Sequence, residues 1–175
     1  MRAANDDSLQ NYMREELYTI LENDQICFRE SEQAENSYKQ GLAKAQIEHT
    51  TKIFEILERE FGVKLKVYHD IQIEPQDSSV TKIVPLLRTV DHYVLFSLYT
   101  VAQQAKSTAI ALAFLLKNEI SFDEAVRIAR VDENYQTSHF GRVEGAHDYD
   151  EASTLATFAT AKNIMNLCLL REPKV

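Results

Sequence analysis

Two histidines and two aspartates lie close together near the end of the chain, at His139, His147, Asp148 and Asp150. Adjacent imidazole and carboxylate groups can hold a divalent metal ion that activates water. Such a site also needs an upstream histidine and a later aspartate, and only His92 and Asp150 are available for these roles. The alternative, which we favour, is that Asp148 caps the start of a helix.

Other patterns that could carry chemistry are isolated. Ser79-Val-Thr-Lys82 matches S-x-x-K, but neither S-D-N nor K-T-G accompanies it, so the match is attributed to chance. The chain has four glycines and contains neither G-x-G-x-x-G nor G-x-x-x-x-G-K-[ST], the loops that cradle phosphates. The sequence therefore contains no glycine-rich phosphate-binding loop, and no cofactor is predicted.

A stripe of residues at helical spacing changes character along its length. Phe122, Val126 and Ala129 are apolar, whereas Glu133, Gln136 and Phe140 continue the same spacing with two polar residues. One interpretation is that the helix leaves the core there and these positions are solvated. The other is that the stripe becomes a partner-binding surface, with Phe140 as anchor and Glu133 as an ion-pair acceptor for Arg130, Arg142 or the partner. The sequence leaves both open.

The elements that position these residues are expected to be helices. Asp7 or Ser8 can cap a helix that ends near Glu22, and a longer helix is predicted from Ser31 to Gly62, where glycine is a natural C-terminal residue. A final helix is predicted over 148–170.

The middle of the chain contains one candidate for extended structure and one for a core helix. Residues 63–73 alternate with period two, which predicts a short strand or hairpin at about 63–74. The segment from Tyr93 to Lys117 is apolar on nearly all sides, which predicts a central buried helix capped by Asp91. Ser121-Phe-Asp-Glu124 is a capping box. We predict a mainly α fold, with residues 1–175 as a single helical domain.

Charge and hydropathy limit the partners. The 175 residues carry a net charge of −8 and show no basic stripe, so nucleic acid is not expected as a partner. The longest uncharged apolar run, Ser107 to Leu116, is about half of the roughly 20 residues that span a bilayer, so no membrane insertion is expected. A charged partner would present a basic surface.

The two cysteines, Cys27 and Cys168, lie in apolar settings far apart in the sequence. They are interpreted as buried thiols, and with no N-x-[ST] sequon they indicate a reducing compartment. Residues 1–11 are acidic and polar, unlike a signal or transit peptide.

Several segments together resemble the ATP synthase assembly factor 2 family. Val131-Asp-Glu-Asn-Tyr-Gln136, Phe140-Gly141 and Val143-Glu-Gly-Ala-His-Asp148 are similar to its acidic-aromatic-Gln, Trp-Gly and Glu-x-x-His-Asp patterns. Upstream, Asp24-Gln-Ile-Cys-Phe-Arg29 and the segment 54–63 also have counterparts. The likeness covers about residues 10–170. Phe140 stands where the family has tryptophan.

The resemblance implies a chaperone rather than an enzyme, active in the mitochondrial matrix, that binds the unassembled α subunit of the ATP synthase catalytic head until β subunits displace it. It also implies a β-rich N-terminal domain ahead of a helical domain, and only the helical part is matched here. The partner-binding candidates are the motif positions Glu133, Tyr135, Gln136, Phe140, Gly141, Glu144, His147 and Asp148.

Two alternatives to the chaperone are considered. The first is a permanent structural subunit of a larger mitochondrial complex, derived from the same family. The second, which we regard as unlikely, is a metal phosphohydrolase of the HD type, built on His147 and Asp148. We expect the free protein to be monomeric, because its acidic ends repel one another and no heptad seam is evident.

Overall fold

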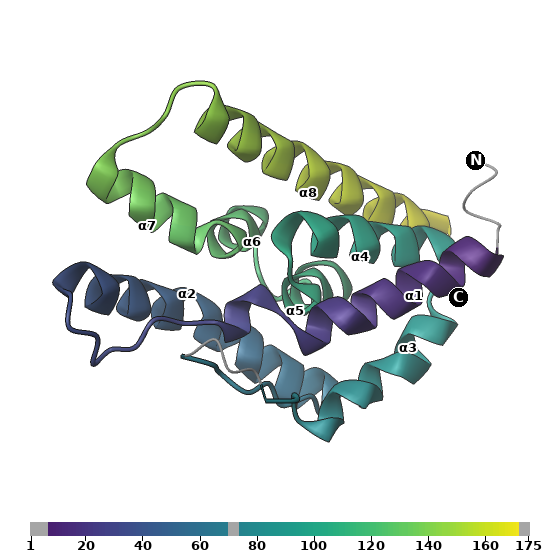
Figure 1. Cartoon of the computed structure of the whole chain (residues 1–175). Helices are drawn as coiled ribbons and strands as arrows, with labels where there is room; N and C mark the ends of the chain where they lie inside the picture. Colours follow the sequence, from purple (N-terminus) through teal and green to yellow (C-terminus); the bar gives the residue numbers. More distant parts are fainter. Residues whose placement is uncertain (1–6, 70–73, 172–175) are drawn as a thin grey trace.

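A computed structural model describes residues 7–69 and 74–171 of the chain, and it confirms the mainly α fold (Figure 1). Helical turns connect the longer helices. The elements are α1 (Asp7–Glu22), η2 (Gln25–Cys27), α2 (Ser37–Phe61), η3 (Ser78–Lys82), α3 (Ile83–Thr89), α4 (His92–Ala105), α5 (Thr108–Ala111), the π-helical turn η4 (Leu112–Lys117), α6 (Phe122–Ala129), α7 (Val131–Phe140) and α8 (Ala146–Arg171).

Local capping signals set several helix ends. The capping box at Ser121 forms as predicted, with reciprocal bonds between Ser121 and Glu124, and Gly62 ends α2 in the left-handed conformation (φ 65°). However, α2 begins at Ser37, six residues later than predicted. Asn36 accepts a hydrogen bond from the Tyr38 backbone N–H at 2.7 Å and caps the helix, while Ser31 closes a separate turn by accepting from the Gln33 N–H.

The predicted central helix is buried, but it is not continuous. It breaks at Lys106, which adopts a positive φ of 50°, and restarts as α5 with Ser107 as its cap. The break is fixed by the connection that follows α1: Gln25 N–H donates to the Lys106 carbonyl, and the Asp24 carboxylate accepts from the Ala109 N–H at 2.9 Å. A long-range carboxylate therefore supplies the hydrogen bond that a continuous helix would have made internally.

The strand or hairpin predicted at about 63–74 is not formed as a regular strand in its described part. That part contains one isolated parallel bridge, in which Arg29 N–H donates to the Tyr68 carbonyl and Tyr68 N–H donates to the Cys27 carbonyl. Side chains rather than a second strand hydrogen-bond further backbone groups of this segment. The side chains of Ser79 and Gln76 accept from the N–H groups of residues 64 and 66. Residues 70–73 of the prediction lie outside the described residues.

The helices pack around the buried segment that contains α5. Helix α8 lies along α4, α1 also packs on α4, and α7 lies against α2 (Figure 1). The core side chains include Leu98, Phe114 and Phe158, and the last two rings stack at 5.6 Å. Within 7–69 and 74–171, no helix has both the length and the apolar composition needed to cross a bilayer.

Candidate protein-binding site

The sequence motif that carries the family resemblance forms helix α7, the connection 141–145 and the first turns of α8. The apolar stripe of α6 does not run on unbroken, because α6 ends at Ala129 and α7 starts after Arg130, whose φ of −120° lies outside the helical region. Helix α7 has no fully buried residue. It is therefore held by contacts along one side rather than enclosed in the core.

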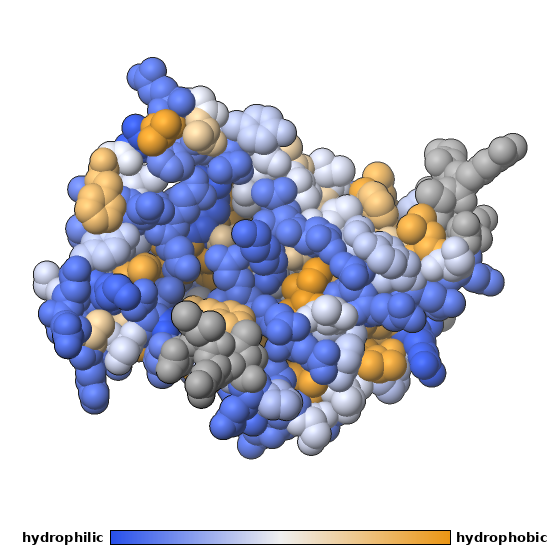
Figure 2. Space-filling model, in the orientation of Figure 1, coloured by the Kyte–Doolittle hydropathy of each residue, from blue (hydrophilic) through white to orange (hydrophobic). Residues whose placement is uncertain are grey.

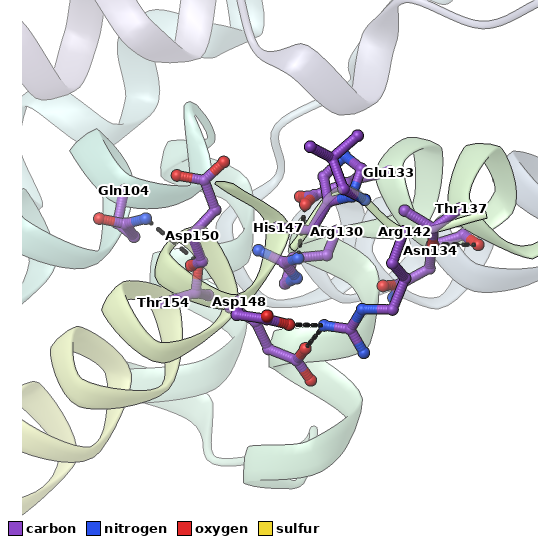
Figure 3. Close-up of polar contacts among 12 residues, drawn as sticks. Gln104, Arg130, Glu133, Asn134, Thr137, Arg142, His147, Asp148, Asp150 and Thr154 are labelled. Atoms are coloured by element: carbon purple, nitrogen blue, oxygen red, sulfur yellow. Dashed lines mark hydrogen bonds and ion pairs between the residues drawn. The ribbon is translucent and has the colours of Figure 1, made fainter. Parts of the chain in front are cut away.

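Glu133 forms an ion pair within the fold. Its carboxylate lies 2.7 Å from the guanidinium of Arg130, and this is the pairing drawn in Figure 3. Arg130 is only 7% exposed, whereas the Glu133 side chain is 26% exposed. Of the two arginines predicted as structural partners, the structure selects Arg130. Glu133 thus neutralises a buried cation while part of its carboxylate remains accessible.

Four rings gather where the end of α7 meets the start of α2. The Tyr38 ring centroid lies 5.2 Å from Tyr135, 5.2 Å from His139 and 5.0 Å from Phe140, and Tyr135 and His139 are 4.3 Å apart. The three distances from Tyr38 are within the range of favourable aromatic pairs, and Tyr135 and His139 lie closer still. Phe140 packs against Tyr38 in a tilted arrangement and is still 72% exposed. We call Tyr38, Tyr135, His139 and Phe140 the aromatic cluster.

Close packing in this cluster depends on a glycine of α2. A Cβ atom added at Gly41 would lie 1.9 Å from the Tyr135 hydroxyl oxygen, which is far inside van der Waals contact. The absent side chain at Gly41 therefore lets α7 and its tyrosine approach α2.

The connection from α7 to α8 is shaped by local polar contacts. Gly141 ends α7 with a φ of 85°, a conformation that favours glycine. The guanidinium of Arg142 pairs with Asp148 at 3.1 Å (Figure 3). It also pairs with Glu151. His147 accepts a hydrogen bond from the Val143 N–H at its Nδ1, and Asp148 accepts from the Gly145 N–H at 3.4 Å.

These contacts bear on the metal-site interpretation of the His-Asp pair. His147 and Asp148 lie in the helix-entry turn, as we favoured from the sequence, but the prediction that Asp148 caps the helix is wrong. The helix starts two residues earlier, at Ala146, and Asp148 accepts from the Gly145 N–H from within the first turn. Among the described residues, no group of three or more His, Cys, Asp or Glu side chains is placed to hold a metal ion.

The surface around this connection combines exposed apolar residues with acids. Phe140, Val143 and Tyr149 are 72%, 61% and 73% exposed, and Glu144 and Asp148 are also exposed. Figure 2 shows apolar surface beside hydrophilic surface around the α7–α8 connection, at the upper left. We call the exposed residues of 133–150 together with the aromatic cluster the α7–α8 surface.

The structure brings the predicted residues onto this surface unevenly. Gln136, Phe140, Gly141, Glu144 and Asp148 are exposed, and Glu133, Tyr135 and His147 are partly covered by their neighbours; none of the eight is fully buried. Sequence reasoning missed Tyr38, which is almost 100 residues away, and no local signal marks it. It also missed Val143 and Tyr149, although large apolar residues inside a polar motif were a signal that could have found them.

No family model matches the chain. Among solved structures, it is similar to Atp12 from Paracoccus denitrificans, with a TM-score of 0.82 and 22% identity over 94% of this chain and 69% of that one. A substituted variant of the same Paracoccus protein gives a TM-score of 0.82 and 22% identity, over 94% and 68%. A candidate chaperone from Agrobacterium tumefaciens gives 0.81 and 20%, over 94% and 59%.

This chain therefore has the fold of the matched part of Atp12, which covers about two thirds of that protein, and the mainly α fold predicted from the sequence is confirmed. The chain spans about 60–70% of the length of these structures.

Proposed function

We propose that this chain is a member of the ATP synthase assembly factor 2 family and acts as a chaperone in ATP synthase assembly. In this proposal it binds the unassembled α subunit in the mitochondrial matrix and releases it when β subunits arrive. The proposal is supported by two independent likenesses: the motif at 131–148 and the shared fold with Atp12. The free protein is proposed to be a monomer.

The observation that carries the proposal is the exposure of the α7–α8 surface. Three large side chains, Phe140, Val143 and Tyr149, are each more than 60% exposed and stand among acids. Contiguous exposed apolar groups with a polar rim are typical of protein-binding surfaces. A subunit that has not yet met its neighbour exposes an apolar interface. Aromatic anchors can cover this interface reversibly, and the surrounding acids can pair with basic groups of the subunit.

The direct test is capture of purified ATP synthase α subunit and suppression of its aggregation on dilution from denaturant. Phe140→Ala is expected to weaken capture at least tenfold, since this ring is 72% exposed and belongs to the aromatic cluster. Its melting temperature is expected to stay near that of the unchanged protein, because a 72% exposed ring adds little to the core.

Phe96→Ala is the matched control. Phe96 is also a large exposed ring, 42% exposed, but it lies on α4, outside the α7–α8 surface. Unchanged capture by Phe96→Ala together with lost capture by Phe140→Ala supports the proposal. Equal capture by both variants and the unchanged protein would show that the recognition surface lies elsewhere.

A second candidate, a permanent subunit of a larger complex, is favoured by one feature of α8. Leu155, Leu167 and Leu170 are 39%, 60% and 77% exposed along this helix. Lasting interfaces are more apolar than transient ones. Quantifying the protein in the purified mature complex separates the two candidates: a fixed ratio identifies a subunit, whereas its loss as assembly completes identifies a chaperone.

A further inference from the structure

A hollow of about 380 Å³ opens beside α2, on the side where the extended segment 28–30 and the first turn of α7 approach it. Its apolar lining includes the rings of Phe28 and Tyr68, whose centroids are 5.5 Å apart, and Leu42 of α2. Its polar lining includes Arg29 and Asp132. Both come from segments of the family-like motifs that are about 100 residues apart in the sequence.

Arg29 enters this hollow as a half-buried cation. One of its terminal nitrogens donates to the Thr50 hydroxyl at 2.6 Å, and the guanidinium lies 4.5 Å from the centroid of the Phe54 ring. Its Nε reaches the Ile26 carbonyl at 3.4 Å. Burial lowers the pKa of Arg29, but the group stays charged because arginine starts from so high a value.

Asp132 enters the same hollow from α7. Gln46 donates to its carboxylate at 2.8 Å and accepts from the Glu30 N–H at 2.8 Å, so this amide is fixed at both ends. Burial, together with the nearby negative charge of Glu30, raises the pKa of Asp132. The carboxylate therefore lies in surroundings that favour an incoming cation.

Neither charge has an ion-pair partner among the described residues, although both line one hollow. Glu30, the other acid nearby, pairs with Lys39 at 3.4 Å. A partly buried charge without a counter-ion is destabilising. A ligand that supplies the missing counter-ion is therefore bound more tightly. The matching ligand offers an acceptor to Arg29 and a cation to Asp132, which an extended peptide with a basic side chain can do at once.

The hollow lies next to the aromatic cluster along α2. Tyr38 and Gln46 are separated by eight residues of this helix, which corresponds to ~12 Å at 1.5 Å per residue. An extended peptide advances about 3.3 Å per residue, so about four residues bridge the two places.

We propose that the hollow binds an extended segment of the protein partner, with a lysine or arginine side chain on Asp132 and a main-chain carbonyl on Arg29. A large apolar residue about four positions away in the same segment rests on the aromatic cluster. This inference rests on the proposed function for the identity of the partner only. The kind of peptide that is bound is inferred from the charged and apolar residues that line the hollow.

The test uses a synthetic peptide of alanine and serine that carries phenylalanine and lysine about four positions apart, and a second peptide with glutamate in place of lysine. Titration of the lysine peptide into ¹⁵N-labelled protein should shift the NMR resonances of the Gln46 side-chain amide and the Asp132 backbone amide. The glutamate peptide is expected to bind at least tenfold more weakly.

Asp132→Asn keeps an acceptor for Gln46 but removes the charge. The affinity for the lysine peptide should therefore fall about tenfold, or by about 1.4 kcal/mol. Asp123→Asn removes an exposed acid of α6 that does not line the hollow, and it should leave binding unchanged. Equal binding of both peptides, or equal loss in both variants, would overturn the inference.

The two proposals fail in different ways. If the protein captures the α subunit but the lysine peptide produces no shifts at the hollow, the hollow is not a peptide site and the chaperone proposal stands. If the peptide binds through Asp132 but the α subunit is not captured, the peptide site stands and the partner is another protein.

Discussion

The junction around Asp24 and the α7–α8 surface both depend on polar side chains, but they use them in opposite settings. Asp24 is fully buried, and its carboxylate accepts hydrogen bonds from the N–H groups of Ile26 and Ala109. Arg142 and its partners Asp148 and Glu151 are largely exposed to solvent. Buried hydrogen bonds fix the fold because breaking one leaves a buried donor or acceptor with neither a protein partner nor water. Exposed ion pairs add little stability and remain available to a partner.

The comparison predicts its largest effect at Asp24. Asp24→Ala leaves the Ala109 and Ile26 N–H groups without acceptors and opens a buried space, so we expect a loss of about 3 kcal/mol or more in the free energy of unfolding. Urea unfolding followed by circular dichroism measures this. A loss below about 1 kcal/mol would show that the junction does not hold the α4–α5 break in place.

The burial of Asp24 also predicts that the stability of the protein depends on pH. Burial raises the pKa of Asp24 from 3.8 to about 7, so the folded state binds a proton more tightly than the unfolded chain does. The free energy of unfolding should therefore be highest near pH 4 and fall as the pH rises toward 7, by up to about 4 kcal/mol. Burial raises the pKa of nearby Cys27, so its thiol stays neutral in this window.

Asp24→Asn is the control for that dependence, because it keeps the shape and removes the titration. Urea midpoints measured from pH 4 to 7 should fall in the unchanged protein and fall less in the variant. Identical slopes would assign the pH dependence to other groups.

At Glu133 the two settings meet, and an intermediate effect is expected. Glu133→Lys places a second cation beside Arg130, which is 7% exposed, and should lower the free energy of unfolding by about 2 kcal/mol. Because Arg130 is buried, this loss of stability is expected in addition to any loss of α-subunit capture. Glu133→Gln, which keeps an acceptor for Arg130, should melt closer to the unchanged protein and isolate the effect on α-subunit capture.

The smallest effect on stability is expected at Gly41. Gly41→Ala gains up to about 1 kcal/mol of helix propensity in α2, but its new Cβ forces the Tyr135 hydroxyl away. The two changes offset each other, so the melting temperature should move little while the ring resonances of Tyr135 and His139 shift. Adding Tyr135→Phe should restore part of the ring packing; unchanged ring resonances in Gly41→Ala alone would contradict the close approach.

The sequence by itself determined the elements whose signals are local. The capping box at Ser121, the glycine that ends α2 at Gly62 and the first helix from Asp7 to Glu22 depend on neighbours within a few residues, so short patterns suffice to predict them. The motif at 131–148 also pointed to the surface whose exposed residues the structure describes.

Only the tertiary structure decided where distant segments meet. The break at Lys106 depends on Asp24, the bridge at Tyr68 depends on Phe28, and the aromatic cluster depends on Tyr38. Each is a contact between residues 40 to about 100 positions apart, which no local period encodes. The physical reason is that a hydrogen bond or a ring contact depends on distance in space, and chain folding sets that distance.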